Sequence, residues 1–215
     1  MGRITFGGGK VGMKMGGSRL PDGYTELAYI QSSGTQYINL GLVGKTGMKF
    51  VGKFMALKSS DLSNSYTFLA ALGPSALRYY PLAFDSGKFG YGYRSFYTST
   101  TTAAVNVEYE FEAEFFSGAQ KLTINGSVVK SSSNTSDIAT STYNLYLFAM
   151  NNDNSPYTPG SYRVYGLSIY DNGTLVRDLV PCVSDADGVG LFDLVNNQFY
   201  GNAGSGSFVG SEVAA

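Results

Sequence analysis

Short runs of β-branched and aromatic residues fill the chain after residue 20, and turn signals separate them. Residues 37–40 alternate polar and apolar side chains, which is typical of a half-buried strand. Residues 143–150 form a continuous apolar run, which favours a central strand buried on both faces. No window shows sustained helical periodicity. The pattern therefore predicts an all-β fold, either a two-sheet sandwich or a barrel.

Asn-Gly pairs mark two tight turns between predicted strands. Asn125-Gly126 follows residues 121–124, and Asn172-Gly173 follows residues 162–170. A type I′ turn needs positive φ at both central residues, which Asn and Gly tolerate. We therefore expect β-hairpins at both positions. The length of 215 residues suits one sandwich domain or two small domains.

The first 20 residues differ in composition from the rest. They contain seven Gly and no acidic residue, and they hold four of the 15 basic residues. The chain therefore divides into a Gly-rich basic arm, 1–20, and a strand-rich body, 21–215, with a net charge of about -5 on the body. Such an arm is either a disordered leader or a docking segment. The residues expected to anchor it are Arg3, Ile4, Phe6, Lys10, Val11, Met13, Lys14 and Met15.

Three residue counts exclude whole classes of active site. The chain has no His, no Trp and one Cys. Without His, neither a Ser-His-Asp nor a Cys-His catalytic arrangement can form. A His-ligated or Cys-cluster zinc site is excluded as well, and so is a disulfide within the chain. The net charge of -1 argues against a broad nucleic-acid surface, and we expect no cofactor or metal.

Targeting signals are not expected in this sequence. No apolar run approaches the roughly 18 residues of a membrane span, so membrane insertion is not expected. The N-terminal segment lacks the apolar core of a signal peptide. Phe6 stands where a myristoylation signal has Ser or Thr. We expect synthesis in a cytoplasm.

Two regions of the chain resemble one known group of domains. Residues 20–38 read LPDGYTELAYIQSSGTQYI, and the later segments read YGLSIYD (165–171), LVRDLVPC (175–182), GLFDLV (190–195) and FYGNAG (199–204). These segments resemble concanavalin A-like (laminin G-like) jelly-roll domains of phages and gut bacteria. The resemblance implies two antiparallel curved sheets, one with a concave face that often binds glycans. It spans residues 20–209.

The same resemblance implies a place on a surface. Domains of this group commonly belong to phage tail fibres, baseplates, capsid decorations or bacterial surface proteins. We therefore expect a non-enzymatic virion protein, oligomeric in its assembly and located on the virion surface, with a bacterial cell surface as the alternative. The arm would bind other subunits, and the jelly roll would be displayed for adhesion to host-surface glycans. The rival hypothesis is a structural capsid decoration protein without glycan binding.

Two groups of residues are candidates for glycan contact. Asn151, Asn152 and Asp153 follow the apolar run, and Tyr157 is close enough in the sequence to stack on a sugar. The alternative is a plain Asx-rich turn. Tyr91 and Tyr93 lie near a Gly-rich hairpin, and the alternative for them is a half-buried strand position. Calcium is not expected in the first loop, because the ion prefers six to eight oxygen ligands and the loop offers one carboxylate.

Four glutamates alternate along residues 108–114, which places their carboxylates on one face of a strand. β-Glucanases with a jelly-roll fold carry alternating carboxylates on one strand, so a glycoside hydrolase is a third hypothesis. This strand lacks the intervening Asp of that pattern, and the chain has no Trp platform for a sugar. We expect a solvated strand face instead, with Tyr109, Phe111 and Ala113 packed inside.

Overall fold

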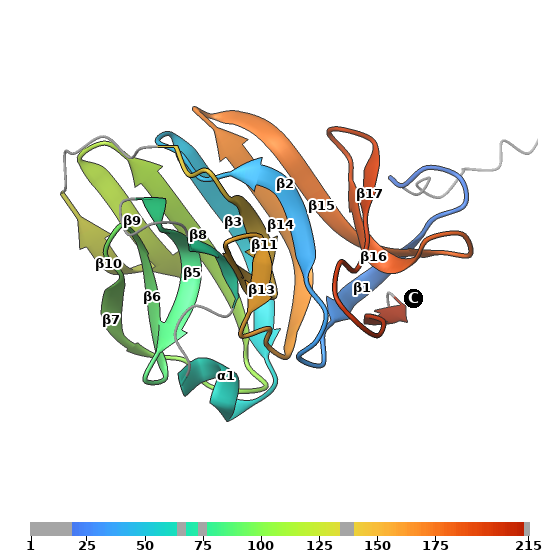
Figure 1. Cartoon of the computed structure of the whole chain (residues 1–215), viewed down its shortest axis with the longest axis horizontal. Coiled ribbons are helices and arrows are strands. Elements are labelled where there is room, and N and C mark those ends of the chain that lie inside the picture. The colour runs from blue at the N-terminus through green and yellow to red at the C-terminus, as the bar shows by residue number, and fades with distance from the viewer. Residues whose placement is uncertain (1–18, 64–67, 73–76, 134–139, 213–215) are drawn as a thin grey trace, which may run out of the picture.

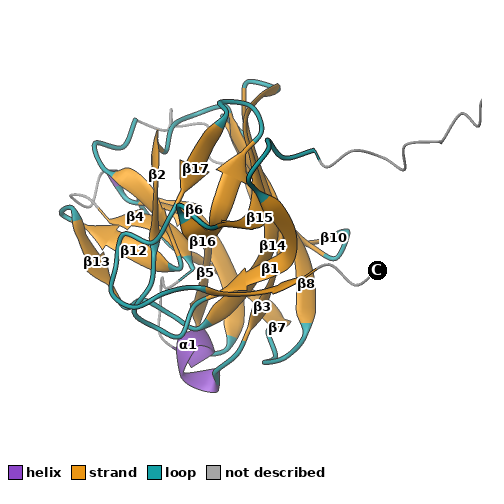
Figure 2. Ribbon diagram, turned by 90° about the vertical axis from the view of Figure 1, so that its right-hand side faces the viewer, coloured by secondary structure: helices purple, strands orange, loops and turns teal. Residues whose placement is uncertain are grey.

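The computed structural model describes residues 19–63, 68–72, 77–133 and 140–212. These residues form two packed β-sheets and one short helix, α1 (Ser59–Ser63). Figure 1 shows α1 at one edge of the two sheets, and Figure 2 shows the sheets as two layers. The predicted two-sheet jelly-roll sandwich is confirmed. In the described ranges, no helix is long and apolar enough to cross a membrane.

The larger sheet has ten strands, and its main path follows the order β10-β9-β8-β3-β14-β1-β15-β16-β17. β18 pairs with β1 outside this path. All the pairings recorded in this sheet are antiparallel. The bounds are β1 (Thr25–Gln31), β3 (Met48–Ala56), β8 (Glu108–Phe116), β9 (Ala119–Ile124), β10 (Ser127–Ser132), β14 (Tyr162–Asp171), β15 (Thr174–Ser184), β16 (Gly188–Asp193), β17 (Gln198–Tyr200) and β18 (Val209–Glu212).

The smaller sheet has eight strands, and its main path follows the order β13-β12-β4-β5-β6-β7. β11 joins it by pairing with both β2 and β4. The β12–β4 pairing is parallel, which departs from the antiparallel arrangement expected throughout. The bounds are β2 (Ile38–Val43), β4 (Leu69–Leu72), β5 (Tyr79–Asp85), β6 (Lys88–Tyr93), β7 (Tyr97–Thr102), β11 (Asn144–Leu147), β12 (Ala149–Asn152) and β13 (Ser155–Tyr157).

Aromatic side chains from both sheets form the core between the layers. Phe54 on β3 lies 4.7 Å from Phe68 and 5.8 Å from Phe84, measured between ring centroids. Phe111 on β8 packs against Phe54 at 6.0 Å. Strands place alternate side chains on opposite faces, so β3 and β8 each supply one apolar row to this core.

Both predicted Asn-Gly hairpins are present. Asn125 and Gly126 have φ of 47° and 76°, and Asn172 and Gly173 have φ of 47° and 82°. Positive φ at both central residues fits a type I′ turn, whose twist matches that of the flanking strands. The first turn joins β9 to β10, and the second joins β14 to β15.

The prediction of one continuous strand over residues 143–150 is wrong. Phe148 has φ of 71° and separates β11 from β12. Its N–H donates to the Phe68 carbonyl at 2.7 Å, and its ring packs 5.1 Å from Phe208. These tertiary contacts hold a bulky residue in a conformation that it rarely adopts, which ends the strand inside an apolar run.

Candidate functional site

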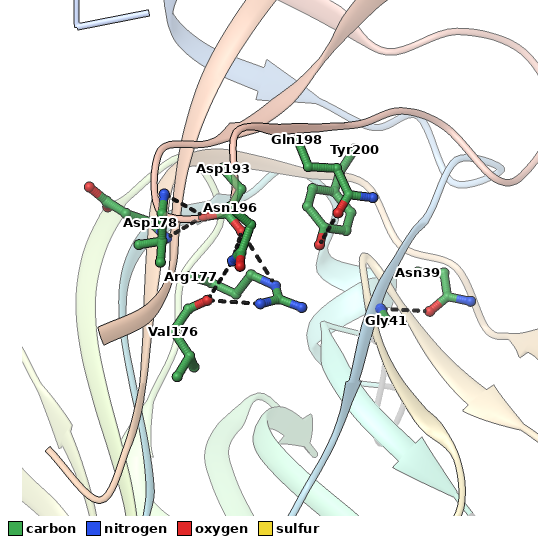
Figure 3. Close-up of polar contacts among 10 residues, drawn as sticks. Asn39, Gly41, Val176, Arg177, Asp178, Asp193, Asn196, Gln198 and Tyr200 are labelled. Carbon is green, nitrogen blue, oxygen red and sulfur yellow. Dashed lines mark hydrogen bonds and ion pairs between the residues drawn. The ribbon is translucent and has the colours of Figure 1, made fainter. Parts of the chain in front are cut away.

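An open pocket of about 480 Å³ lies between β2, β15, β17 and the segment that follows β17. Polar and aromatic side chains from distant parts of the sequence meet there (Figure 3). We call it the Arg177 pocket. Its lining consists of Asn39, Gly41, Arg177, Gln198, Phe199, Tyr200, Gly201 and Ala203.

Arg177 on β15 is the one charged residue in this lining. Its Nη1 donates to the Val176 carbonyl at 2.8 Å, and its Nε lies 3.4 Å from Oδ2 of Asp193. The guanidinium also lies 6.0 Å from the centre of the Tyr200 ring. The side chain is only 17% exposed, so these contacts hold its position. Figure 3 shows it extending into the space between Tyr200 and Gly41.

Asp193, at the end of β16, forms an ion pair with Arg177 and holds its guanidinium in position. Its side chain is fully buried. Oδ1 accepts the backbone N–H groups of Asp178 and Val195 at 3.0 Å each, and Oδ2 accepts the side-chain amide of Asn196 at 2.7 Å. A buried carboxylate needs several such partners to offset its lost hydration. The network thereby fixes the β16–β17 turn and the Arg177 guanidinium in one rigid unit.

Two residues with amide side chains, Asn39 and Gln198, belong to the other walls of the pocket. Asn39 on β2 uses its Oδ1 to accept the Gly41 N–H at 3.0 Å. Gln198 on β17 uses its Oε1 to accept the Tyr200 hydroxyl at 3.3 Å. Both residues are exposed, so their remaining amide groups are open to a ligand. Figure 3 shows the Gln198 amide beside Tyr200, whereas the Asn39 amide lies beyond Gly41 with its nitrogen directed away from Arg177.

The first group of residues predicted to contact a glycan lies on the hairpin of β12 and β13, outside the Arg177 pocket. Asn152, Asp153 and Tyr157 are exposed there, and Tyr157 reaches 50% exposure. Asp153 and Asn154 both have positive φ, so they form the tight turn that the Asx-rich alternative predicts. The contact of these three exposed residues with a sugar stays a prediction.

Asn151, Tyr91 and Tyr93 are buried, which corrects their assignment as surface candidates. Asn151 is 0% exposed, and its Nδ2 donates to the Asn144 carbonyl at 2.8 Å. Tyr91 is also fully buried, and its hydroxyl donates to the Gln120 carbonyl. Tyr93 is 4% exposed and belongs to the core cluster. β6 turns both tyrosines toward the larger sheet, so a glycan on the surface cannot stack on them in this conformation.

The proposed anchoring residues, Arg3 to Met15, lie outside the described residues. Arg19, where the described chain begins, borders a second hollow of about 450 Å³ on the outer face of the larger sheet. Lys53, Glu110 and Asp178 contribute charged groups to this hollow. The ion pair between Arg19 and Glu26, 2.6 Å long, ties the start of the described chain to β1.

The four glutamates of β8 lie on a partly solvated face, and three of them, Glu108, Glu112 and Glu114, pair with lysines of the neighbouring strands. Lys49 lies 2.7 Å from Glu112, and Lys121 lies 3.2 Å from Glu114. Lys53 forms a further ion pair with Glu108. Phe111 and Ala113 point into the core, as the alternation predicted, while Tyr109 is partly buried.

This environment lowers the pKa of two of these carboxyl groups. The hydrogen bond from Lys53 is the main cause of the lowered pKa of Glu108. Burial acts to raise the pKa of Glu112, but the hydrogen bond and charge of Lys49 contribute to an overall lowering. A glycosidase acid needs the opposite, a raised pKa. In the described parts of the chain, no group of three or more His, Cys, Asp or Glu could hold a metal ion.

The Arg177 pocket was not predicted from the sequence. Its residues come from positions 39–41, 177 and 198–203, and only the folded sheets bring them together. One signal was available, because Arg177 is the one basic residue within the segment LVRDLVPC. The resemblance identified that segment as part of the fold without assigning it a role.

No protein-family model and no curated protein sequence matches the chain. Among solved structures, mouse laminin alpha1 chain domains LG4-5 match with a TM-score of 0.50 and 12% identity. This match covers 82% of this chain and 50% of the laminin chain, so the described fold spans about half of that relative.

Two bacterial structures align more loosely. Domain 4 of AbnA, a GH43 extracellular arabinanase from Geobacillus stearothermophilus solved with arabinotriose, gives a TM-score of 0.43 and 19% identity over 62% of this chain and 64% of that one. Carbohydrate-binding module CBM66 from Bacillus subtilis gives a TM-score of 0.35 and 10% identity. That match covers 66% of this chain and 91% of the CBM66 chain. At these identities the comparisons concern the fold alone. The chain has the laminin G-like, concanavalin A-like jelly-roll fold.

Proposed function

We propose that this chain is a non-catalytic carbohydrate-binding domain and that the Arg177 pocket is its binding site. The observation that carries the proposal is the pocket itself. A fixed guanidinium, two residues with exposed amide side chains and the largely buried Tyr200 line one open volume. Ligand sites are typically concave and use a small number of well-placed polar groups to fix the orientation of the ligand.

Two observations support a binding role over a hydrolytic one. The lining of the Arg177 pocket contains no carboxylate, whereas retaining and inverting glycosidases both use a pair of them. The four glutamates of β8 lie outside this lining, and three of them are paired with lysines. The lowered pKa values of Glu108 and Glu112 keep both groups ionised at neutral pH, which does not suit a general acid.

The finer part of the proposal concerns location. The domain would be displayed on the surface of a virion, or alternatively of a bacterial cell, where it would bind host-surface glycans. The basic arm, residues 1–20, would anchor it to other subunits of the assembly. The charge division between a basic arm and an acidic body supports this arrangement, because it favours a docked partner for the arm.

A purely structural capsid decoration protein is the second candidate. The hollow beside Arg19 and the adjoining ion pairs of β3 and β8 favour it, since they place a charged surface next to the start of the described chain. Under this alternative the Arg177 pocket has no ligand.

A glycan array with the full chain separates the two candidates. The carbohydrate-binding proposal predicts retention of a defined set of glycans, and Gln198→Ala should weaken that binding by roughly ten-fold through loss of one hydrogen-bonding side chain. Asn152→Ala on the β12–β13 hairpin is the matched control, because it also removes an exposed amide. No retention of any glycan at high protein concentration favours the structural role. Loss of binding in Asn152→Ala alone moves the site to the hairpin.

A further inference from the structure

The side-chain oxygens around the Arg177 pocket already accept hydrogen bonds from the protein. Oδ1 of Asn39 accepts the Gly41 N–H, and Oε1 of Gln198 accepts the Tyr200 hydroxyl. Both oxygens of Asp193 are likewise engaged, and that side chain is fully buried behind Arg177. Each of these side-chain oxygens therefore already has at least one hydrogen-bond partner within the protein.

The nitrogen donors of the same walls remain open. Nε and Nη1 of Arg177 face Asp193 and the Val176 carbonyl, but Nη2 has no acceptor among the described residues (Figure 3). The side-chain amide nitrogens of Asn39 and Gln198 also have no recorded acceptor in the described part of the chain. The Asn39 nitrogen is directed away from Arg177, so two open N–H-bearing groups border the pocket, the cationic Nη2 of Arg177 and the amide nitrogen of Gln198.

A neutral sugar hydroxyl both donates and accepts, so it is best satisfied where a site offers acceptors as well. A carboxylate or sulfate only accepts, and its hydrogen bonds with a guanidinium are short and strong. The lining holds no acidic residue that would repel such a group. Two open donors, one of them on a fixed cation, and a lining without a carboxylate together match an anionic oxygen group.

We infer that the Arg177 pocket binds an acidic sugar through its anionic group, with Nη2 of Arg177 and the amide nitrogen of Gln198 as the donors. The inference rests on the proposed carbohydrate-binding function and names its ligand class. The shared chemistry is an oxyanion on a sugar, which either a carboxylate or a sulfate ester supplies.

Two isosteric substitutions test this without disturbing the core. Asn39→Asp and Gln198→Glu each retain the oxygen that the protein uses and replace the amide nitrogen with a carboxylate oxygen. Both residues are exposed, so the fold should tolerate the change. Binding of the full-chain protein to sialyllactose, tetragalacturonate, sulfated lactose and plain lactose is measured by calorimetry. Asn152→Asp adds the same charge on the β12–β13 hairpin and serves as the control.

The inference predicts that an acidic oligosaccharide binds at least about ten-fold more tightly than lactose, because hydrogen bonds to charged groups are the stronger ones. Asn39→Asp and Gln198→Glu should each weaken acidic binding by roughly ten-fold or more, and Asn152→Asp should not. Binding should also weaken as the salt concentration rises. Arg177→Lys, which keeps the charge but loses the planar fork, should reduce binding as well.

Each outcome decides the matter. Preference for sialyllactose or tetragalacturonate assigns a carboxylate ligand, and preference for sulfated lactose assigns a sulfate. Equal or tighter binding of lactose, unaffected by Asn39→Asp and Gln198→Glu, overturns the anionic inference while carbohydrate binding stands. Absence of binding to these four sugars and to every glycan on the array removes the proposed function itself.

Discussion

Cys182 shows how burial controls the chemistry of one side chain. It lies on β15 with 0% exposure, and burial raises the pKa of its thiol to about 12, with a smaller contribution from Asp187. The reactive form of cysteine is the thiolate, which is therefore scarce at pH 8. We expect no labelling by a chromogenic disulfide reagent at pH 8 in the folded protein and full labelling in denaturant. Rapid labelling of the folded protein would contradict this placement.

Truncation of Phe54 should strongly destabilise the core. Its ring is fully buried among Phe68, Phe84 and Phe111. Removal of a buried aromatic ring leaves a cavity, so Phe54→Ala should lower the free energy of unfolding by about 3–5 kcal/mol. Urea titration measures the change. Val128→Ala, at a position 58% exposed, should change it by less than about 0.5 kcal/mol.

At the residue scale, the sequence predicted local geometry better than it predicted exposure. Asn172-Gly173 marked a turn correctly because its backbone preference is a property of the pair itself. Tyr91 and Tyr93 were candidate surface residues, but alternation along a Gly-rich strand does not reveal which face a sheet will cover. Asn151 illustrates the same point, since its burial depends on Asn144 from another strand.

At the element scale, the ion pairs across β3, β8 and β9 determine how stability depends on pH. The pKa values of Glu108 and Glu112 are lowered in the folded state. A lowered folded pKa means that the unfolded chain binds more protons, so the stabilisation is present above the unfolded pKa of about 4.3 and is lost as pH falls through the folded pKa. The free energy of unfolding should therefore fall between pH 5 and pH 3, as urea titrations can measure.

Lys49→Met isolates this contribution, because Lys49 pairs with both Glu112 and Glu114. These groups are partly exposed, so the loss at pH 7 should be below about 1 kcal/mol. The variant should also lose less stability than the unaltered protein between pH 5 and pH 3. Lys130→Met, outside this row of ion pairs, should show the same pH dependence as the unaltered protein. An unchanged pH dependence in Lys49→Met would refute the explanation.

The strands themselves were largely predictable, with one instructive exception. Period-two alternation over residues 108–114 indicated correctly which side chains enter the core, because both neighbouring strands lie on the same sheet. The apolar run 143–150 gave no sign of its interruption at Phe148. The break depends on hydrogen bonding to Phe68 and packing on Phe208, and hydrophobicity alone does not encode either contact.

At the scale of the whole molecule, the basic arm and the acidic body suggest a bipartite protein. Our proposal predicts that the triple variant Arg3→Glu, Lys10→Glu and Lys14→Glu will co-purify with assembled particles in much smaller amounts, because reversed charges oppose docking. The body should keep its circular dichroism spectrum. The double variant Lys88→Glu and Lys130→Glu in the body should still incorporate. Normal incorporation of the triple variant would remove the anchoring role of the arm.

The fold was accessible from sequence resemblance, but the candidate site was not. The resembling segments supplied β1, β14, β15, β16 and β17, whose pairing the structure records. The Arg177 pocket arises where β2 of the smaller sheet meets β15 and β17 of the larger one. Such a site depends on how two sheets pack, and the pattern of residue types along the sequence does not show that packing.

The most direct test of the account is an NMR titration of the full chain with the glycan that binds best on the array. The account predicts that the side-chain resonances of Arg177, Asn39 and Gln198 shift together and saturate with one dissociation constant. The amide resonances of Asn152 and Asp153 should not shift. The claim under test is that the Arg177 pocket binds the glycan. Shifts confined to resonances of the β12–β13 hairpin, with no shift in the Arg177 pocket, would contradict it.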